Sequence, residues 1–306
     1  MTADPLLAPT APLDQFRENR VYLGADHARN ERRTWIVTAI CALTLIVQVA
    51  GGLMFRSMAL TASGLHMGAH VAALLTAAFA YALARRYAGD ARFSFGTGKV
   101  GYLAGFANAV LLAATALAIT VESVERLFHP EAVDYAAAVP LAAAGLAVNL
   151  VCVWLLRPVN RGHRHDAHGD LNISAAHLHL SADAMVSVLA IAGLLAGRTL
   201  GWGWADPAAG VLGAVLVAHF AWTLIRRAGA NLLDMNPSPA LAAEIRERLQ
   251  RDGEQVMDLH LWRLGPGHHA AIAVIASPAP LEPEAYRARL AGLPELSHVT
   301  IEARRR

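Results

Sequence analysis

Six long apolar stretches dominate the pattern of hydrophobic and polar positions along the chain. An α-helix needs about 20 apolar residues to cross the hydrocarbon core of a bilayer. Within lipid, only α-helices and closed β-barrels provide hydrogen-bond partners for all of their backbone N–H and C=O groups. The pattern therefore predicts an all-α membrane bundle of six transmembrane helices. The predicted spans lie near residues 34–54, 59–83, 100–127, 136–156, 172–197 and 206–225.

The pattern changes near residue 236, where the sequence NPSP ends the apolar part. The segments LAAEIRERLQ and PEAYRARLAGL have the periodicity of helices, and VMDLHLWRL, HAAIAVIA and HVTIEAR have that of strands. Their order, α-β-β-α-β, predicts a small α+β domain of the ferredoxin-like kind. A domain of about 70 residues buries little surface by itself, so we expect a homodimer.

These patterns divide the chain into three parts. We expect a cytoplasmic N-terminal tail over residues 1–33, a six-helix transmembrane domain over 34–235 and a cytoplasmic C-terminal domain over 236–306. The N-terminal residues lack a basic segment followed by an apolar core, so we do not expect a signal peptide there.

The composition agrees with a membrane protein. Hydrophobic residues make up 55% of the chain and charged residues 16%, with a mean hydropathy of +0.37, whereas soluble domains carry about 25% charged residues. The formal net charge of +2 is too small to indicate a nucleic-acid partner. Cys41 and Cys152 both fall in apolar stretches and form no CxxC pair, so we expect small buried side chains rather than a disulfide framework.

The basic residues between the predicted spans are distributed unequally. Fourteen flank the spans on one side of the membrane and three on the other, and the side richer in Lys and Arg is the cytoplasmic one. We therefore expect a multi-pass protein of the cell inner (plasma) membrane with both termini in the cytoplasm. The fourteen are Arg17, Arg20, Arg29, Arg32, Arg33, Arg85, Arg86, Arg92, Lys99, Arg157, Arg161, Arg164, Arg226 and Arg227, and the three are Arg56, Arg126 and Arg198.

Two spans carry ionisable residues where such residues are costly. His66 and His70 lie in the second span, and His179 and Asp183 lie in the fifth. Each pair has the i, i+4 spacing that places both side chains on one face of a helix. An ionisable residue inside a span indicates a functional site by default, so these four are candidate ligands. His177 is two residues from His179 and faces elsewhere, toward either the inner mouth or a packing contact.

The flanking polar residues place the two pairs at similar depth. Arg56 and Arg85 flank the second span, whereas Asp170 and Arg198 flank the fifth. The midpoints of both spans fall close to the ionisable pairs, although the two predicted helices run antiparallel. We therefore favour a shared site, and polar residues that hydrogen-bond across the bundle are the alternative interpretation.

Three imidazoles and one carboxylate match the tetrahedral shell that borderline divalent metals take. Nitrogen ligands favour Zn, Co or Ni over Mg or Ca, which prefer oxygen. Metal and protons compete for the same imidazoles, because metal ligands must be deprotonated, and an unperturbed His titrates at about pH 6.5. The four residues thus predict a carrier that exchanges divalent transition metals for protons, and the outward direction of metal movement comes from the family resemblance described next.

Several motifs over roughly residues 33–305 resemble those of the cation diffusion facilitator family. LHMGAH lies in the second span, FSFGTGKVGYLAGFAN enters the third and ESVERLFHP leaves it. LNISAAHLHLSAD lies in the fifth span, WADPAAG opens the sixth, and DLHLWRLGPGHHA lies in the tail. The HMGxH pattern is similar to the cobalt/nickel-type (DmeF-like) branch, because the commonest zinc exporters of the family carry Asp at the second of these two positions.

The resemblance implies a homodimeric metal/proton antiporter whose transport site is formed by His66, His70, His179 and Asp183. It also implies that a divalent transition metal is the transported substrate, that no prosthetic group is required, and that protons and the lipid bilayer are the other partners. We expect cobalt efflux, with nickel and zinc as the alternative metals.

Two predicted cytoplasmic loops are weighed as further metal sites. Family members often bind metal in the loop after the second span, through an acidic residue and histidines. In this chain Asp90 is the remaining candidate ligand, and Phe93 and Thr97 occupy positions where histidines would be expected, so no site is predicted there. The loop before the fifth span is rich in histidine, which suits weak metal capture, although a solvated loop explains it equally well. Its candidates are His163, His165 and His168, with Asp166 and Asp170.

The C-terminal domain is a third place to consider. Some family members bind zinc there, at positions that fall on Ala273 and Glu302 in this chain, so that site does not carry over. The remaining histidines form either a different site or exposed strand and loop positions. They are His260, His268, His269 and His298.

Two other functions are the alternatives. Membrane di-iron oxygenases and desaturases also contain HxxxH pairs, but theirs lie near the membrane surface, whereas His66 and His70 lie in mid-span with an Asp partner. A metal sensor with a membrane anchor would account for the tail domain but not for the mid-membrane ligands. A transporter is therefore the preferred interpretation.

Overall fold

The computed structural model describes residues 21–54, 58–129, 133–157, 170–251 and 253–306. The side chains of residues 52, 58–63, 65 and 66 also fall outside the description. The first twenty residues, the histidine-rich loop with His163, His165 and His168, and the side chain of His66 are therefore outside the described part of the chain.

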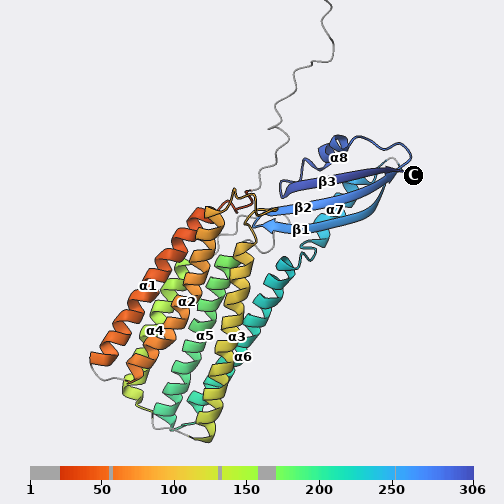
Figure 1. The fold of residues 1–306 in the computed structure, drawn as a ribbon. Coiled ribbons are helices and arrows are strands. Elements are labelled where there is room, and N and C mark those ends of the chain that lie inside the picture. The colour runs from red at the N-terminus through yellow and green to blue at the C-terminus, as the bar shows by residue number, and fades with distance from the viewer. Residues whose placement is uncertain (1–20, 55–57, 130–132, 158–169, 252) are drawn as a thin grey trace, which may run out of the picture.

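Six long helices form an elongated bundle with the small C-terminal domain at one end (Figure 1). All six are long and apolar enough to cross a membrane, which confirms the predicted bundle. The helices are α1 (His27–Met54), α2 (Met58–Arg86), α3 (Val100–Phe128), α4 (Tyr135–Leu155), α5 (Leu171–Leu200) and α6 (Ala205–Leu232).

Local sequence signals set several helix ends. The Asp134 side chain accepts hydrogen bonds from the backbone N–H groups of Ala136 and Ala137 and so caps α4. Asp170 accepts from the backbone N–H of Asn172 and caps α5. These caps satisfy N–H groups that have no partner within the helix. Gly201 ends α5 with φ of 71°, a conformation that costs glycine little.

Helix α5 is the central element of the bundle. It contributes Ile173, Ala176 and Leu180 to one buried cluster, shared with α1, α2 and α4. It contributes Ala175 and Ala182 to a second buried cluster, shared with α3 and α6. A helix buried on two sides holds its side chains in fixed positions, which is what a site in the middle of the bundle requires.

The two cysteines meet at the contact between α1 and α4. Cys41 and Cys152 are fully buried, and their Sγ atoms lie 3.7 Å apart. Both are free thiols. The expected small buried side chains are therefore present, and they form a pair that the sequence does not reveal.

The C-terminal domain has the predicted order of elements. They are α7 (Pro239–Leu249), β1 (Gln255–Gly265), β2 (His268–Ser277), α8 (Pro283–Leu290) and β3 (Leu296–Arg305). Strand β1 pairs antiparallel with β2, and β2 pairs parallel with β3, so α8 is the crossover between two parallel strands. A buried core closes the sheet against the two helices through Leu241, Ile245, Ile275 and Tyr286. The predicted fold class, a membrane bundle with a small α+β domain, is confirmed.

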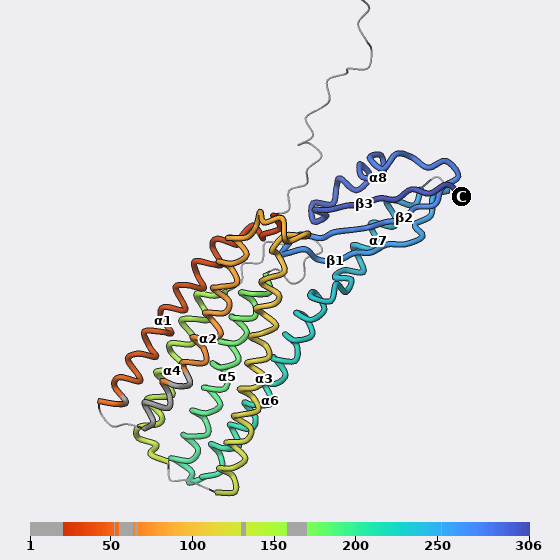
Figure 2. Tube along the Cα trace, viewed as in Figure 1, coloured from red at the N-terminus to blue at the C-terminus, as the bar shows by residue number. Residues whose placement is uncertain are grey.

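The bundle contacts the C-terminal domain at the β1–β2 turn (Figure 2). The Nε2 atom of His268 lies 3.3 Å from the backbone carbonyl oxygen of Leu23. In the loop between α2 and α3, the Phe95 ring lies edge to face with that of Trp262, with centroids 5.6 Å apart. The N-terminal segment and this loop thus join the two parts of the chain.

Candidate metal site

The candidate site lies where α2 passes α5. His70 of α2 is 3% exposed and His179 of α5 is 6% exposed. Asp183 follows His179 by one turn on α5, and its side chain is 14% exposed. Three of the four predicted ligands are therefore together and largely buried, whereas the side chain of His66 lies outside the described residues.

His70 lies between the other two residues. Its Nδ1 atom is 3.0 Å from Nε2 of His179, and its Nε2 atom is 3.2 Å from Oδ2 of Asp183. The two imidazole rings meet edge to face, with centroids 5.1 Å apart and planes at 83°. Both ring nitrogens of His70 therefore face a partner.

These contacts form a chain rather than a shell. Among the described residues, no three His, Cys, Asp or Glu side chains surround a point that would hold an ion. The reason is local, because His70 fills the space between His179 and Asp183. An ion bound by all three side chains must take over at least one of the contacts that His70 makes here.

One buried residue at the site was not predicted. Asn149 of α4 is 3% exposed, and its Nδ2 group donates a hydrogen bond to Oδ2 of Asp183. The sequence carries a signal for it, since α4 is strongly apolar and a polar amide there is costly. Asn149 is not ionisable, so it was not among the predicted ligands.

The residues on the loops and in the first half of α5 have other contacts. Asp170 accepts hydrogen bonds from Asn30 of α1 and Tyr81 of α2. Because it also caps α5, its carboxylate connects three helices. Asp90 accepts from Arg92 at 2.7 Å, and these hydrogen bonds hold the pKa of Asp90 below its ordinary value. His177 is half-buried, and no described contact joins it to the candidate site.

The histidines of the C-terminal domain do not gather into a site among the described residues. The Nε2 atom of His260 is 2.7 Å from the Asp258 carboxylate on the exposed side of β1. The Nδ1 atom of His268 lies 2.7 Å from the Ser297 hydroxyl. His269 is fully buried. These three histidines therefore make local contacts within the sheet or pack in its interior.

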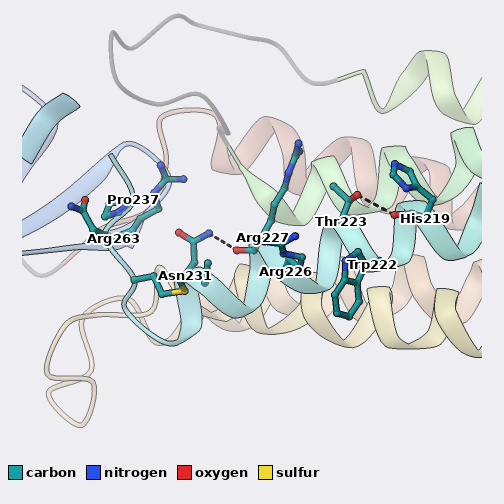
Figure 3. Close-up of a pocket in the computed structure, with 11 residues that line it drawn as sticks. His219, Trp222, Thr223, Arg226, Arg227, Asn231, Pro237 and Arg263 are labelled. Atoms are coloured by element: carbon teal, nitrogen blue, oxygen red, sulfur yellow. Dashed lines mark hydrogen bonds between the residues drawn. The ribbon is translucent and has the colours of Figure 1, made fainter. Parts of the chain in front are cut away.

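The cavity at the end of α6 has the wrong charge for a cation (Figure 3). It has a volume of about 480 Å³ and includes Arg226, Arg227 and Arg263 in its lining. No carboxylate is among the described residues that line it. Three guanidinium groups in the lining disfavour a metal cation, so the contact between α2 and α5 is the better candidate.

The chain is similar to known proteins over most of its length. A family model described as "Cation efflux transmembrane domain" matches residues 34–233. The zinc transporter ZitB of Escherichia coli is 34% identical over 239 residues, 77% of this chain and 74% of that protein. The metal cation efflux system protein CzcD of Cupriavidus metallidurans is 31% identical over 292 residues, 92% of this chain and 90% of that protein.

A third relative, from Bacillus velezensis, carries the description "cadmium, cobalt and zinc/H(+)-K(+) antiporter" and is 29% identical over 80% of this chain and 78% of its own length. The family model alone spans more than half of this chain. Members of the family are transporters, so the alternative of a membrane di-iron enzyme is wrong. The chain belongs to the cation efflux family, the cation diffusion facilitators.

Proposed function

We propose that this protein exports divalent transition-metal ions through a site formed by His66, His70, His179 and Asp183. The observation that carries the proposal is the direct contact of His70 with both His179 and Asp183 inside the bundle. Such side chains are costly inside a membrane, so their presence there indicates a functional site. The relatives described as zinc, or as cadmium, cobalt and zinc, transporters support this class of substrate.

When a metal ion binds at this site, the contacts of His70 with His179 and Asp183 give way to contacts with the ion. A metal ligand must offer a lone pair, so a nitrogen of His70 that bears a proton must release it before an ion binds there. The protons lost from the imidazoles are then available for movement in the opposite direction. We therefore propose metal/proton antiport, and the relative described as an antiporter supports it.

We propose cobalt as the preferred metal, with nickel and zinc as the other candidates. The two histidines at i, i+4 on α2, together with His179 and Asp183 on α5, give the proposed shell three nitrogens and one carboxylate. A shell rich in nitrogen favours Co, Ni and Zn over harder ions. The basic residues support a location in the inner membrane with both termini in the cytoplasm, and the small C-terminal domain supports a homodimer.

The antiport proposal is tested with purified protein sealed into vesicles. An imposed proton gradient is expected to drive cobalt across the membrane against its own gradient, and a proton ionophore is expected to abolish this movement. His70→Ala vesicles are the matched control, because they carry the same gradient without the proposed ligand. Cobalt flux that does not change with the proton gradient contradicts antiport.

A further inference from the structure

The Asn149 side chain of α4 hydrogen-bonds to a candidate ligand. It is almost completely buried, and its Nδ2 group donates to the Oδ2 atom of Asp183. The same Oδ2 atom lies 3.2 Å from Nε2 of His70. One carboxylate oxygen is thus shared between an imidazole from α2 and an amide from α4.

The other end of the same amide has no hydrogen bond. The Oδ1 atom of Asn149 is buried, and no partner is present among the described residues. A buried acceptor without a partner costs free energy in an apolar environment. Asn108 and Asn172 also leave Oδ1 without a partner, but their Nδ2 groups donate to backbone carbonyls of Ala73 and Ala77. Among these three amides, only that of Asn149 touches a candidate ligand.

A half-turn of the amide exchanges its two ends. The terminal torsion of Asn is broad and roughly two-fold, so the rotation places Oδ1 where Nδ2 now meets Asp183. A metal ion bound to Asp183 lies about 2.0–2.2 Å from the carboxylate oxygen. An amide oxygen within hydrogen-bond distance of that carboxylate is therefore within reach of the same ion, and amide carbonyl oxygens are known metal ligands.

From this geometry we propose that Asn149 is a further metal ligand, whose amide oxygen joins the three imidazoles and the Asp183 carboxylate. The proposal rests on the proposed function of these four residues. It gives the bound ion five ligands, three nitrogens and two oxygens. In this structure the amide instead donates to Asp183 and holds the carboxylate in place.

The fifth ligand bears on which metal is exported. Closed zinc sites in proteins are almost always four-coordinate and tetrahedral, and selectivity among divalent transition metals is set by geometry and ligand type. An additional oxygen favours ions that accept more than four ligands, such as cobalt and nickel. Removal of the Asn149 amide therefore shifts the preference of the site toward zinc.

The test is cobalt binding to the full-length protein in detergent, followed by visible absorption and X-ray absorption. Tetrahedral Co²⁺ absorbs severalfold more strongly than five-coordinate Co²⁺, because mixing of d and p orbitals is greater without the fifth ligand. The wild type is expected to give the weaker spectrum and five nitrogen or oxygen neighbours. Asn149→Ala is expected to absorb more strongly, lose one neighbour and bind cobalt about 10-fold or more weakly.

Two variants control for a loss of fold. Asn149→Asp retains an oxygen at the same place and is expected to keep the weaker, five-coordinate spectrum. Asn108→Ala removes an equally buried amide from α3, one that donates to the backbone carbonyl of Ala73 and to no candidate ligand, and is expected to match the wild type. The wild-type neighbour count tests the proposal even when Asn149→Ala does not fold.

Two results overturn the inference and leave the proposed function standing. One is a tetrahedral spectrum with four neighbours in the wild type. The other is Asn149→Ala with wild-type cobalt affinity and spectrum, while His70→Ala loses cobalt. A wild type that binds no metal contradicts the proposed function itself, and the inference then fails with it.

Discussion

Gly98 lies at a close backbone approach between the bundle and the C-terminal domain, and a single methyl group there tests how the two are joined. A Cβ atom at this position would lie 2.3 Å from the carbonyl oxygen of Leu264, 2.7 Å from that of Tyr22 and 2.8 Å from Cα of Gly265. All three are backbone atoms, so rotation of a side chain does not relieve the clash. We predict that Gly98→Ala loosens the C-terminal domain from the bundle.

The distances give the approximate free-energy cost of the added methyl group. Ordinary van der Waals contact begins at 3.4 Å, so the Gly98 loop and the β1–β2 turn must separate by about 1.1 Å. Overpacking of this kind typically costs about 1–3 kcal/mol. If the whole cost falls on this contact, the population in which the two parts are undocked rises about 5- to 150-fold.

Hydrogen exchange of the full-length protein measures this opening, because exchange reports local free energies directly. Gly98→Ala is expected to speed exchange in the peptides that contain Phe95 and Trp262, while peptides within the six helices stay protected. Gly89→Ala is the matched control, since it lies in the same loop and its added Cβ meets no atom within 4 Å. Equal exchange in Gly98→Ala, Gly89→Ala and the wild type would refute the reasoning.

Two further predictions concern stability. Asp170→Ala removes a helix cap, worth about 1 kcal/mol, and two side-chain hydrogen bonds, each worth about 1.5–3 kcal/mol. The midpoint temperature of its thermal unfolding should therefore be clearly lower than that of Asp134→Ala, which removes only a cap. Burial raises the pKa of Glu254, but hydrogen bonds from Arg289 and Tyr286 outweigh this effect and hold the pKa below its ordinary value. This stabilisation is present above about pH 5 and lost as the pH falls through the folded pKa, so the C-terminal domain should resist proteolysis less at about pH 3, and Glu254→Gln should weaken that dependence.

Hydropathy locates the parts of helices that cross a membrane, but not where the helices end. The first predicted span begins at residue 34, whereas α1 begins at His27. Its polar first turns continue the helix outside the apolar stretch, where Asn30 donates to Asp170 and Glu31 pairs with Arg85. Helix α6 likewise continues past Arg226 and Arg227 to Leu232. In α1, tertiary hydrogen bonds stabilise these polar turns, and hydropathy does not predict such bonds.

The candidate site was predictable as far as periodicity and depth reach. The i, i+4 spacing places His179 and Asp183 on one face of α5, and the similar depth of the two pairs predicts that this face meets His70, as the contacts show. Metal binding by these residues stays a prediction. The order of contacts through His70 was not predictable, since it depends on side-chain rotamers. The contact of Asn149 with Asp183 was not predictable either, because it depends on how α4 packs against α5, and an apolar pattern does not determine that packing.

The most direct test of the central claim is metal accumulation in cells that lack their own exporters. Cobalt, nickel and zinc are measured in parallel in cells that express the wild type, His70→Ala or His219→Ala, the last a histidine of α6 outside the site. The account predicts that the wild type and His219→Ala lower cellular cobalt and that His70→Ala does not. It is contradicted if His70→Ala lowers metal as well as the wild type does, or if the wild type changes the level of none of the three.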